Sequence, residues 1–393
     1  MATKESTVAS LQHEGDLTLS LGCKVCPFLA DCGGLRVTAG VFDCLRFCPR
    51  CEPKRCDLVC PRAPRRFVAR CAEVGGFALS ALPRFPQKDA ALGLPGAVPL
   101  LYGASGRKGP LICGAVAVPL YRLNYHLSGM PRFVTRESLA DSFRFANSAA
   151  LVLSGTDCDQ SIERWWGIRD KGPLFDALIN LQPAIVTSPN YSLPLNVPRH
   201  DNLHSIKRIG TSCVELGSAG IPVALHVNAR TDNDWTTWTH FIGDRPEISF
   251  VAFEFATGGR TLQRRAWYVE KLLRLRSEAG RPLGLVVRGG LEALRELAVA
   301  FESLTYIDTD SYVRTMKRRR FDSLVGEWVP ASTRPGELLD NLLACNVCEM
   351  ARYVERLTDQ RLPTNYVYHE PWQPSLLNES SPIERGTQSS NRQ

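Results

Sequence analysis

From residue 149 onward the chain repeats one pattern, in which a short apolar run is followed by a longer stretch with apolar residues three and four positions apart. Runs of this length are typical of buried strands, and the longer stretches are typical of amphipathic helices. We predict strands at 149–154, 183–188, 221–229, 248–256, 282–288 and 304–308. The clearest helices are predicted between them, at 203–216, 262–280 and 290–304.

This succession of strand-then-helix steps implies a parallel sheet with crossover helices, and hence the α/β class. A closed barrel needs more strands than the repeat supplies, and the apolar segments 98–103 and 114–123 can provide them. We therefore predict a (β/α) barrel, complete or else partial and irregular. An open doubly wound sheet is the alternative.

The chain divides into segments of different composition. Its two ends, 1–18 and 373–393, are polar and lack apolar periodicity, so we expect both to be disordered. Between them we predict a Cys-rich module at 19–74, the barrel domain at 75–330 and a helical extension at 331–372.

The composition, with 44% hydrophobic and 22% charged residues over 393 positions, is typical of a globular protein. The sequence has no apolar stretch approaching the ~20 residues of a membrane span, so we expect no membrane partner. The opening residues MATKESTVAS do not form a secretory signal. We therefore expect a cytoplasmic location and a reducing environment.

Nine cysteines lie between Cys23 and Cys71, and no histidine lies among them. Clustered thiolates under reducing conditions are typical of metal or cluster ligation rather than of disulfides. We predict sites of four thiolates each, holding zinc or an iron-sulfur cluster. The predicted ligands are Cys23, Cys26, Cys32, Cys44, Cys48, Cys51, Cys56 and Cys60, with Cys71 left over.

The ends of the predicted strands are unusually polar. In a barrel the active site is built at the carboxyl ends of the strands, so these residues are the candidates for chemistry. His226, Asn228 and Arg230 alternate with Leu225, Val227 and Ala229, so the polar set shares one face. We expect that face to line the barrel interior, because the apolar set suits the helix layer.

The same argument assigns roles to the other strand ends. We predict His226, Glu254 and Asp157 as catalytic residues, the first two as general acid or base. The predicted ligand-binding residues are Ser188, Asn190, Asn228, Arg230, Arg288 and Asp308. The alternatives are that the charged groups form a structural ion network and that Asp157 caps a helix.

The net charge of +7 is mild and leaves nucleic acid open as a partner. Basic residues gather at 317–320 and at Arg62, Arg65, Arg66 and Arg70, but aromatic residues are not interleaved with either group. A solvated surface is the simpler interpretation of both.

The spacing of Cys44, Cys48 and Cys51 resembles the three-cysteine motif of radical S-adenosylmethionine enzymes. That resemblance implies a cluster with one open iron, S-adenosylmethionine as cofactor and a partial (β/α) barrel. Several features depart from the family. The motif precedes the strand–helix repeat instead of following its first strand, Arg50 replaces the usual aromatic residue, and no Gly-Gly-Glu follows.

A second resemblance covers about 20 to 320. The strings SGTDCDQSIERWWGIRD, IVTSPNYSLPLNVPRHDNLHSIKRI, ALHVNART, FEFATGG and LVVRGG, with CGGL and FDCLRFC, resemble an uncharacterised bacterial and phage-associated family, a domain of unknown function. The resemblance implies a barrel-like domain and a link to mobile elements. It implies no reaction and no catalytic residue.

These patterns predict an enzyme that acts on a small or nucleotide-like anionic ligand at a barrel mouth, beside a metal or iron-sulfur module. One alternative is an enzyme of the radical S-adenosylmethionine type. The other is a non-catalytic nucleic-acid-binding protein with structural zinc.

Overall fold

The computed structural model describes residues 17–19, 36–38, 64–87, 93–124, 130–169, 173–194, 199–256, 261–334 and 336–359. All eight cysteines predicted as metal or cluster ligands lie outside these ranges. Among the first 63 residues only two short strands are described, β1 (Leu17–Leu19) and β2 (Arg36–Thr38), which pair antiparallel.

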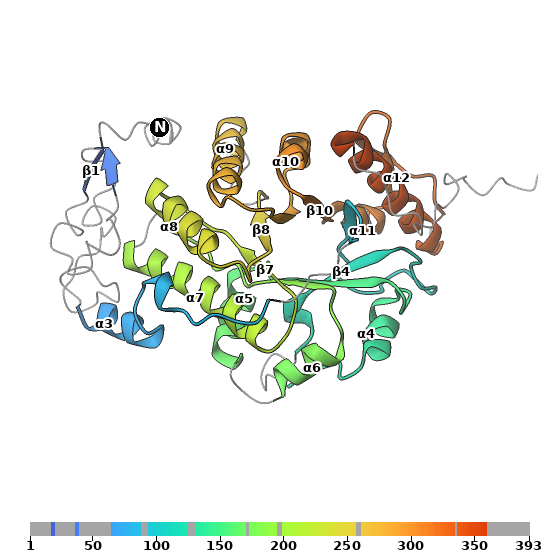
Figure 1. The fold of residues 1–393 in the computed structure, drawn as a ribbon. Helices are drawn as coiled ribbons and strands as arrows, with labels where there is room; N and C mark the ends of the chain where they lie inside the picture. The colour runs from blue at the N-terminus through green and yellow to red at the C-terminus, as the bar shows by residue number, and fades with distance from the viewer. Residues whose placement is uncertain are drawn as a thin grey trace, which may run out of the picture.

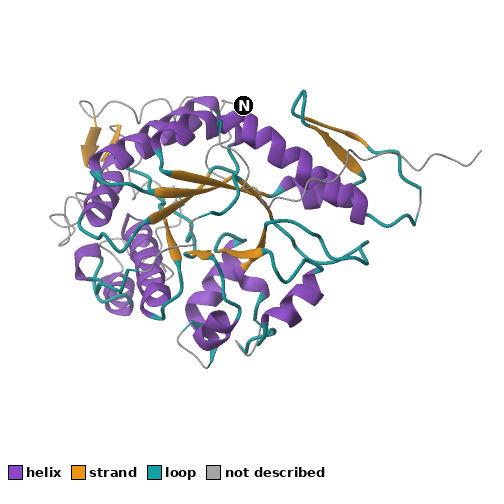
Figure 2. Ribbon diagram, turned by 45° about the vertical axis from the view of Figure 1, so that its right-hand side comes forward, coloured by secondary structure: helices purple, strands orange, loops and turns teal. Residues whose placement is uncertain are grey.

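Eight parallel strands form the central sheet, in the order β3-β10-β9-β8-β7-β6-β5-β4. They are β3 (Ala97–Pro99), β4 (Ala115–Pro119), β5 (Ala150–Ser154), β6 (Ile185–Thr187), β7 (Val223–His226), β8 (Phe250–Glu254), β9 (Gly284–Arg288) and β10 (Ser303–Asp308). The first and last strands of this order meet through a parallel bridge between Leu100 and Ala117. The sheet is therefore a nearly closed barrel (Figure 2), which confirms the predicted (β/α) barrel, including the two strands placed before residue 149.

The helices lie outside the barrel (Figure 1). They are α4 (Arg136–Phe143), α5 (Asp159–Ile168), α6 (Leu174–Asn180), α7 (Arg199–Ser218), α8 (Asp232–Gly243), α9 (Leu262–Glu278), α10 (Leu294–Ala300) and α11 (Asp310–Met316). The short 3-10 turns η4 (Leu120–Arg122) and η5 (Leu291–Ala293) complete the connections.

Alternation along the strands divides the buried apolar residues into two clusters. The lumen cluster consists of Val98, Leu100, Ala115, Ala117, Val152, Ile185, Ala224, Ala252, Val286 and Ile307. The larger cluster fills the space between the sheet and the helices, and it contains Leu225, Val227 and Ala229 as predicted. Small and branched side chains therefore fill the lower lumen, and the polar residues are confined to its mouth.

Strand β7 is shorter than predicted, ending at His226 rather than at residue 229. A capping box starts α8 at once, because the Thr231 side chain accepts from the Asp234 N–H and Asp234 accepts from the Thr231 N–H. Asp234 Oδ2 also accepts from the Arg230 N–H at 2.8 Å. These bonds fix the start of α8 at the end of the short loop that follows β7.

The segment before the barrel, α3 (Pro64–Glu73) and η3 (Leu79–Ala81), runs along the outside of the helix layer. A side chain at Gly210 of α7 would meet Leu82 at 2.8 Å, and one at Gly217 would meet Phe85 at 2.3 Å. These two glycines therefore let the incoming segment approach the surface of α7 closely.

The C-terminal part consists of a hairpin, β11 (Arg319–Asp322) with β12 (Glu327–Pro330), and the long helix α12 (Asp340–Thr358). Buried Asn346 of α12 joins them, since its Oδ1 accepts from the Phe321 N–H at 2.8 Å. Cys345 and Cys348 are buried in α12. No helix in the described part of the chain is long and apolar enough to cross a membrane.

Candidate active site at the barrel mouth

Three neighbouring strands place one polar side chain each at the mouth. His226 ends β7, Glu254 ends β8 and Arg288 ends β9. Each lies two residues after a member of the lumen cluster, so each belongs to the lumen face of its strand. The register pairs Glu254 directly with Arg288. The structure therefore brings together three of the residues for which the sequence predicts acid–base or ligand-binding roles.

The Arg288 guanidinium crosses the mouth. Its Nη1 donates to the Thr156 carbonyl at 2.6 Å, and Thr156 follows β5, four strands away in the ring. Its Nη2 donates to the Tyr102 hydroxyl at 3.4 Å. Its Nε lies 3.4 Å from Oε2 of Glu254 as an ion pair. The side chain is still 17% exposed, so Arg288 is the cation that a ligand arriving at the mouth would meet.

Glu254 is more deeply placed, with a side chain only 4% exposed. Its Oε1 accepts from the Ala256 N–H at 2.9 Å, whereas Oε2 accepts no hydrogen bond from any described residue. Burial raises the pKa of Glu254 above its usual value, and the Arg288 charge and the Ala256 N–H oppose that shift. A carboxyl group in this position can exchange a proton close to neutral pH more readily than one in water.

His226 is 2% exposed. Its Nε2 lies 3.2 Å from the Thr156 hydroxyl, and its Nδ1 has no hydrogen-bond partner among the described residues. The pKa of His226 is lowered to about 3, first by burial and then by the Arg288 charge, while the backbone of Val227 acts in the opposite direction. The imidazole is therefore neutral at physiological pH, held through Nε2 by Thr156 and more weakly by the Val227 backbone.

Asn190, Asn228 and Arg230 form a second polar group between the ends of β6 and β7. Asn228 Nδ2 donates to Asn190 Oδ1 and to the Tyr191 carbonyl, both at 3.0 Å. Arg230 Nε donates to the Leu193 carbonyl. Strand β7 ends at His226, so Asn228 and Arg230 lie in the loop that follows the strand.

The side chains of the remaining predicted site residues accept hydrogen bonds from backbone N–H groups. Ser188 Oγ accepts from the His226 N–H at 2.8 Å, which joins β6 to β7 at the mouth. Asp157 Oδ1 accepts from the Cys158 N–H at 2.7 Å, just before α5 begins. Asp308 accepts from the Asp310 N–H at 2.9 Å and the Ser311 N–H at 3.1 Å at the start of α11. Burial raises the pKa of Asp308 to about 6.

Asp308 lies apart from the mouth group. It shares its strand face with Leu304 and Tyr306, which belong to the helix-layer cluster, whereas Ile307 belongs to the lumen cluster. Its side chain therefore stabilises the turn into α11 rather than lining the lumen.

The mouth contains two residues that we did not predict, Tyr102 and Thr156. Both follow a barrel strand on the lumen face, two residues beyond Leu100 and Ser154. Applying the strand-end argument to the first predicted strands would have found them. Burial raises the pKa of Tyr102, so its hydroxyl stays protonated and is available to ligands as a donor.

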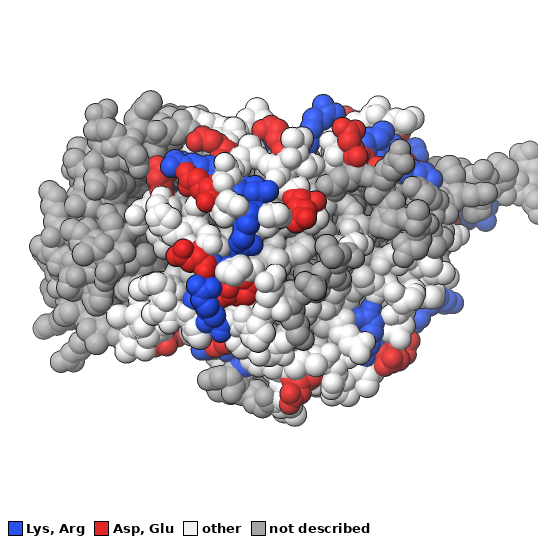
Figure 3. Space-filling view, viewed as in Figure 1, with Lys and Arg blue, Asp and Glu red and all other residues white. Residues whose placement is uncertain are grey.

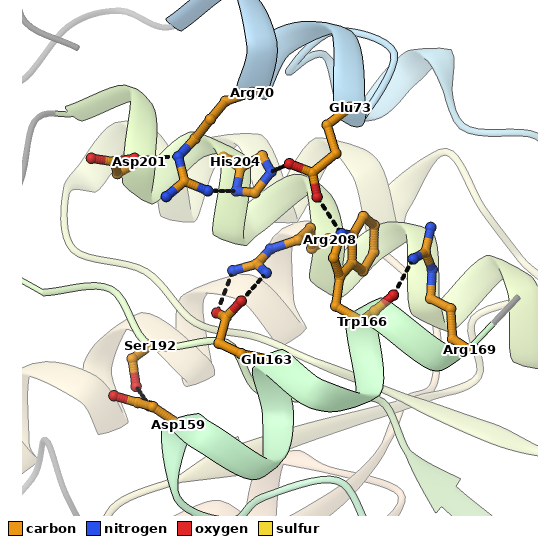
Figure 4. A network of polar contacts seen from close by, with 10 residues as sticks. All are labelled: Arg70, Glu73, Asp159, Glu163, Trp166, Arg169, Ser192, Asp201, His204 and Arg208. Carbon is orange, nitrogen blue, oxygen red and sulfur yellow. Dashed lines mark hydrogen bonds and ion pairs between the residues drawn. The ribbon is translucent and has the colours of Figure 1, made fainter. Parts of the chain in front are cut away.

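A separate, partly buried network joins α3 to α5 and α7 (Figure 4). Arg70 Nη1 lies 3.0 Å from His204 Nδ1, and His204 Nε2 lies 3.1 Å from Glu73 Oε2. Because a guanidinium only donates, Nδ1 must accept, and Nε2–H must donate to Glu73. Burial, then Arg208 and Arg70, lower the pKa of His204 to about 4, so the imidazole is held neutral.

The two consecutive tryptophans belong to this packing. Trp165 is 2% exposed, and Trp166 donates its indole N–H to Glu73. The Arg169 guanidinium lies 3.4 Å from the centre of the Trp166 ring. Arg208 makes a bidentate pair with Glu163 at 2.6 and 2.7 Å. Both tryptophans are therefore core residues, and the network anchors α3 to the barrel.

Within the described residues, no group of three or more His, Cys, Asp or Glu side chains could hold a metal ion. On the face in Figure 3, basic and acidic side chains are interspersed rather than gathered by sign. The mouth group offers a cation, a buried carboxyl and a neutral imidazole within one small volume. This combination can bind an anionic group and transfer protons to or from it.

No protein-family model matches the chain, and a search of curated proteins found no significant match. The resemblance to the phage-associated family of unknown function remains a prediction.

Proposed function

We propose that the barrel mouth is the active site of an enzyme that acts on a small or nucleotide-like anionic ligand. The proposal depends on one observation above all. His226 is buried, and its Nδ1 has no hydrogen-bond partner among the described residues. Leaving a buried polar atom unpaired costs about 1–3 kcal/mol, and a ligand atom bound at the mouth would supply the missing partner.

The surrounding residues support this role. Arg288 provides the positive charge for an anionic group, and Tyr102 provides a neutral donor beside it. Glu254 and His226 are the groups that would exchange protons with the ligand, as base or acid. The polar group of Asn190, Asn228 and Arg230 offers further contacts for the rest of a nucleotide-like ligand.

The test replaces His226 by glutamine, whose amide can keep the contact with Thr156 but has no counterpart of Nδ1. We expect His226→Gln to abolish turnover and to reduce the thermal stabilisation that nucleotides confer on the wild-type protein. The melting temperature without ligand should change little. His240, an exposed residue in the last turn of α8, gives the matched control, and His240→Gln should behave like the wild type. Equal ligand responses in both variants would contradict the proposal.

We also propose that the Cys-rich segment binds zinc or an iron-sulfur cluster. The support is its cysteine spacing, since the eight residues lie outside the described part of the chain. Purification without oxygen, followed by an absorption spectrum and metal analysis, distinguishes the two. A protein with zinc and no iron would exclude the alternative that uses S-adenosylmethionine and a cluster.

Nucleic-acid binding is the competing hypothesis. If it holds, affinity should fall steeply with added salt, and the replacement of Arg65 and Arg66 should reduce that slope. The interspersed charges in Figure 3 do not favour it on the face shown.

A further inference from the structure

We propose that the ligand group bound by Arg288 is an oxyanion, such as a carboxylate, phosphate or sulfate group, and that its binding is coupled to the uptake of a proton by Glu254. This inference rests on the proposed function, because it concerns the same mouth. It adds the chemical class of the ligand group and a linkage between binding and pH.

The first support is the poor geometry of the ion pair in the free protein. Arg288 Nε and Glu254 Oε2 lie 3.4 Å apart, and neither atom makes a hydrogen bond with a described residue. An oxyanion can instead form two parallel, charge-assisted hydrogen bonds with a guanidinium. Such a ligand is therefore a better partner for Arg288 than Glu254 is.

The second support is that the Glu254 side chain is buried more deeply than the Arg288 side chain. The Arg288 side chain is 17% exposed and the Glu254 side chain 4% exposed. A ligand coming from solvent thus reaches Arg288 first, while Glu254 stays behind it with little access to water. Glu254 cannot exchange its pairing with Arg288 for hydration when the ligand arrives.

The third support is the charge balance after binding. If the oxyanion displaces Glu254, a buried carboxylate loses its only ion-pair partner among the described residues. If instead both share Arg288, two negative charges face one cation. Either outcome favours the protonated form of Glu254, because a buried charge without compensation is disfavoured and like charges repel.

The other titratable groups around Arg288 are poorer proton acceptors. Burial raises the pKa of Tyr102, so its hydroxyl is already protonated. Tyr306 and Asp308 lie on the neighbouring strand β10 on the face that packs against the helices, not on the face of Arg288. His226 stays neutral because its pKa is about 3. Asp157 is partly exposed, and its Oδ1 accepts from the Cys158 N–H at 2.7 Å. Glu254 alone combines deep burial, a raised pKa and direct pairing with the cation that the ligand occupies.

The proton comes from solvent and goes to Oε2, because Oε1 already accepts from the Ala256 N–H. The Oε2–H group can then donate a hydrogen bond to the bound oxyanion. Protonation thus converts a repulsive carboxylate into a donor, which explains how one buried carboxyl group can serve an anion site.

The experiment is a calorimetric titration of the full chain with sulfate near neutral pH. Sulfate stays doubly charged there, so every proton exchanged belongs to the protein. Tris and bis-Tris differ in ionisation enthalpy and do not compete as anions, so the difference in observed heat between them counts the protons. We expect uptake approaching about one proton per sulfate, and sulfate affinity that falls as the pH rises, by up to about tenfold per pH unit.

Four variants complete the test. Glu254→Gln should bind sulfate without proton uptake, and Arg288→Gln should not bind it. Glu296→Gln, which changes an exposed residue of α10, should take up protons like the wild type. His226→Gln should take up the proton as well. Circular dichroism checks the folding of each variant, and the pH dependence of the wild type remains decisive if Glu254→Gln does not fold.

The possible failures are distinguishable. Sulfate binding to the wild type without proton uptake overturns the coupling but leaves the anion site of the proposed function intact. Uptake that persists in Glu254→Gln and is lost in His226→Gln assigns the proton to the histidine and overturns the inference. Absence of sulfate binding, or binding that survives Arg288→Gln, overturns the inference and also removes Arg288 from the proposed active site.

Discussion

Replacing Arg288 by methionine should destabilise the protein far more than replacing Glu254 by glutamine. Arg288→Met leaves the Glu254 side chain, 4% exposed, without the cation that now faces it. Removing one partner of a buried ion pair costs about 3–5 kcal/mol of unfolding free energy. In Glu254→Gln the Arg288 guanidinium still donates to the Thr156 carbonyl and contacts solvent, and the amide oxygen can still accept from the Ala256 N–H. We therefore expect this variant to lose about 1 kcal/mol of unfolding free energy or less.

The loss in Arg288→Met should depend on pH, with a sign that follows from the raised pKa of Glu254. Without Arg288 this pKa rises further, so the folded protein binds the Glu254 proton more tightly than the unfolded chain does. Stability is therefore greatest below the unfolded pKa of a glutamate, about 4.3, and falls as the pH rises through the folded value. Each unit of difference between the two pKa values removes about 1.4 kcal/mol at high pH.

The measurement is urea unfolding of the wild type, both single variants and the double variant in mildly acidic and mildly alkaline buffer. The double variant should be more stable than Arg288→Met at alkaline pH, because no buried carboxylate is left unpaired. The reasoning is refuted if Arg288→Met loses no more stability than Glu254→Gln. It is also refuted if the loss grows on acidification.

Three further results are expected. Gly155→Ala should lower unfolding free energy by about 1–3 kcal/mol in urea titrations, because its Cβ would meet the Thr187 and Ser188 carbonyl oxygens at 2.2 and 2.6 Å. The control Gly167→Ala in α5 has open space and should be neutral or stabilising; equal effects would show that the close approach is unimportant. The wild type should lose stability as the pH falls from 6.5 to about 4, because His204 binds a proton in the unfolded chain but not in the folded protein. His204→Gln should reduce this loss, and an unchanged pH profile of unfolding free energy would contradict the reasoning. Removal of metal with a chelator should lower the melting temperature of protein purified without oxygen, because metal binding is coupled to folding, and a protein free of zinc and iron before chelation would contradict the metal hypothesis.

The sequence by itself determined the barrel and the interior position of its central polar residues. Apolar runs alternating with helical periodicity specify parallel strands, because each strand must be covered by the helix that follows it. The side-chain period of two within a strand placed Glu254 with Ala252, and His226 with Ala224, on the lumen face. These are local properties, so they can be recognised without knowing which strands are neighbours.

The tertiary structure decided which polar residues meet. Strand β7 ends at His226 and the capping box of α8 starts the next helix at Asp232, so Asn228 and Arg230 lie in the connecting loop, where Asn228 bonds to Asn190 and Tyr191. Barrel closure brings the end of β5 opposite β9, so Arg288 reaches the Thr156 carbonyl, 132 positions away in the chain. Contacts of this kind depend on strand order, stagger and loop direction, which are set by packing across the whole barrel. Periodicity along one segment carries no information about them, which is why the contacts of Arg288 with Thr156 and Tyr102 emerged only from the folded chain.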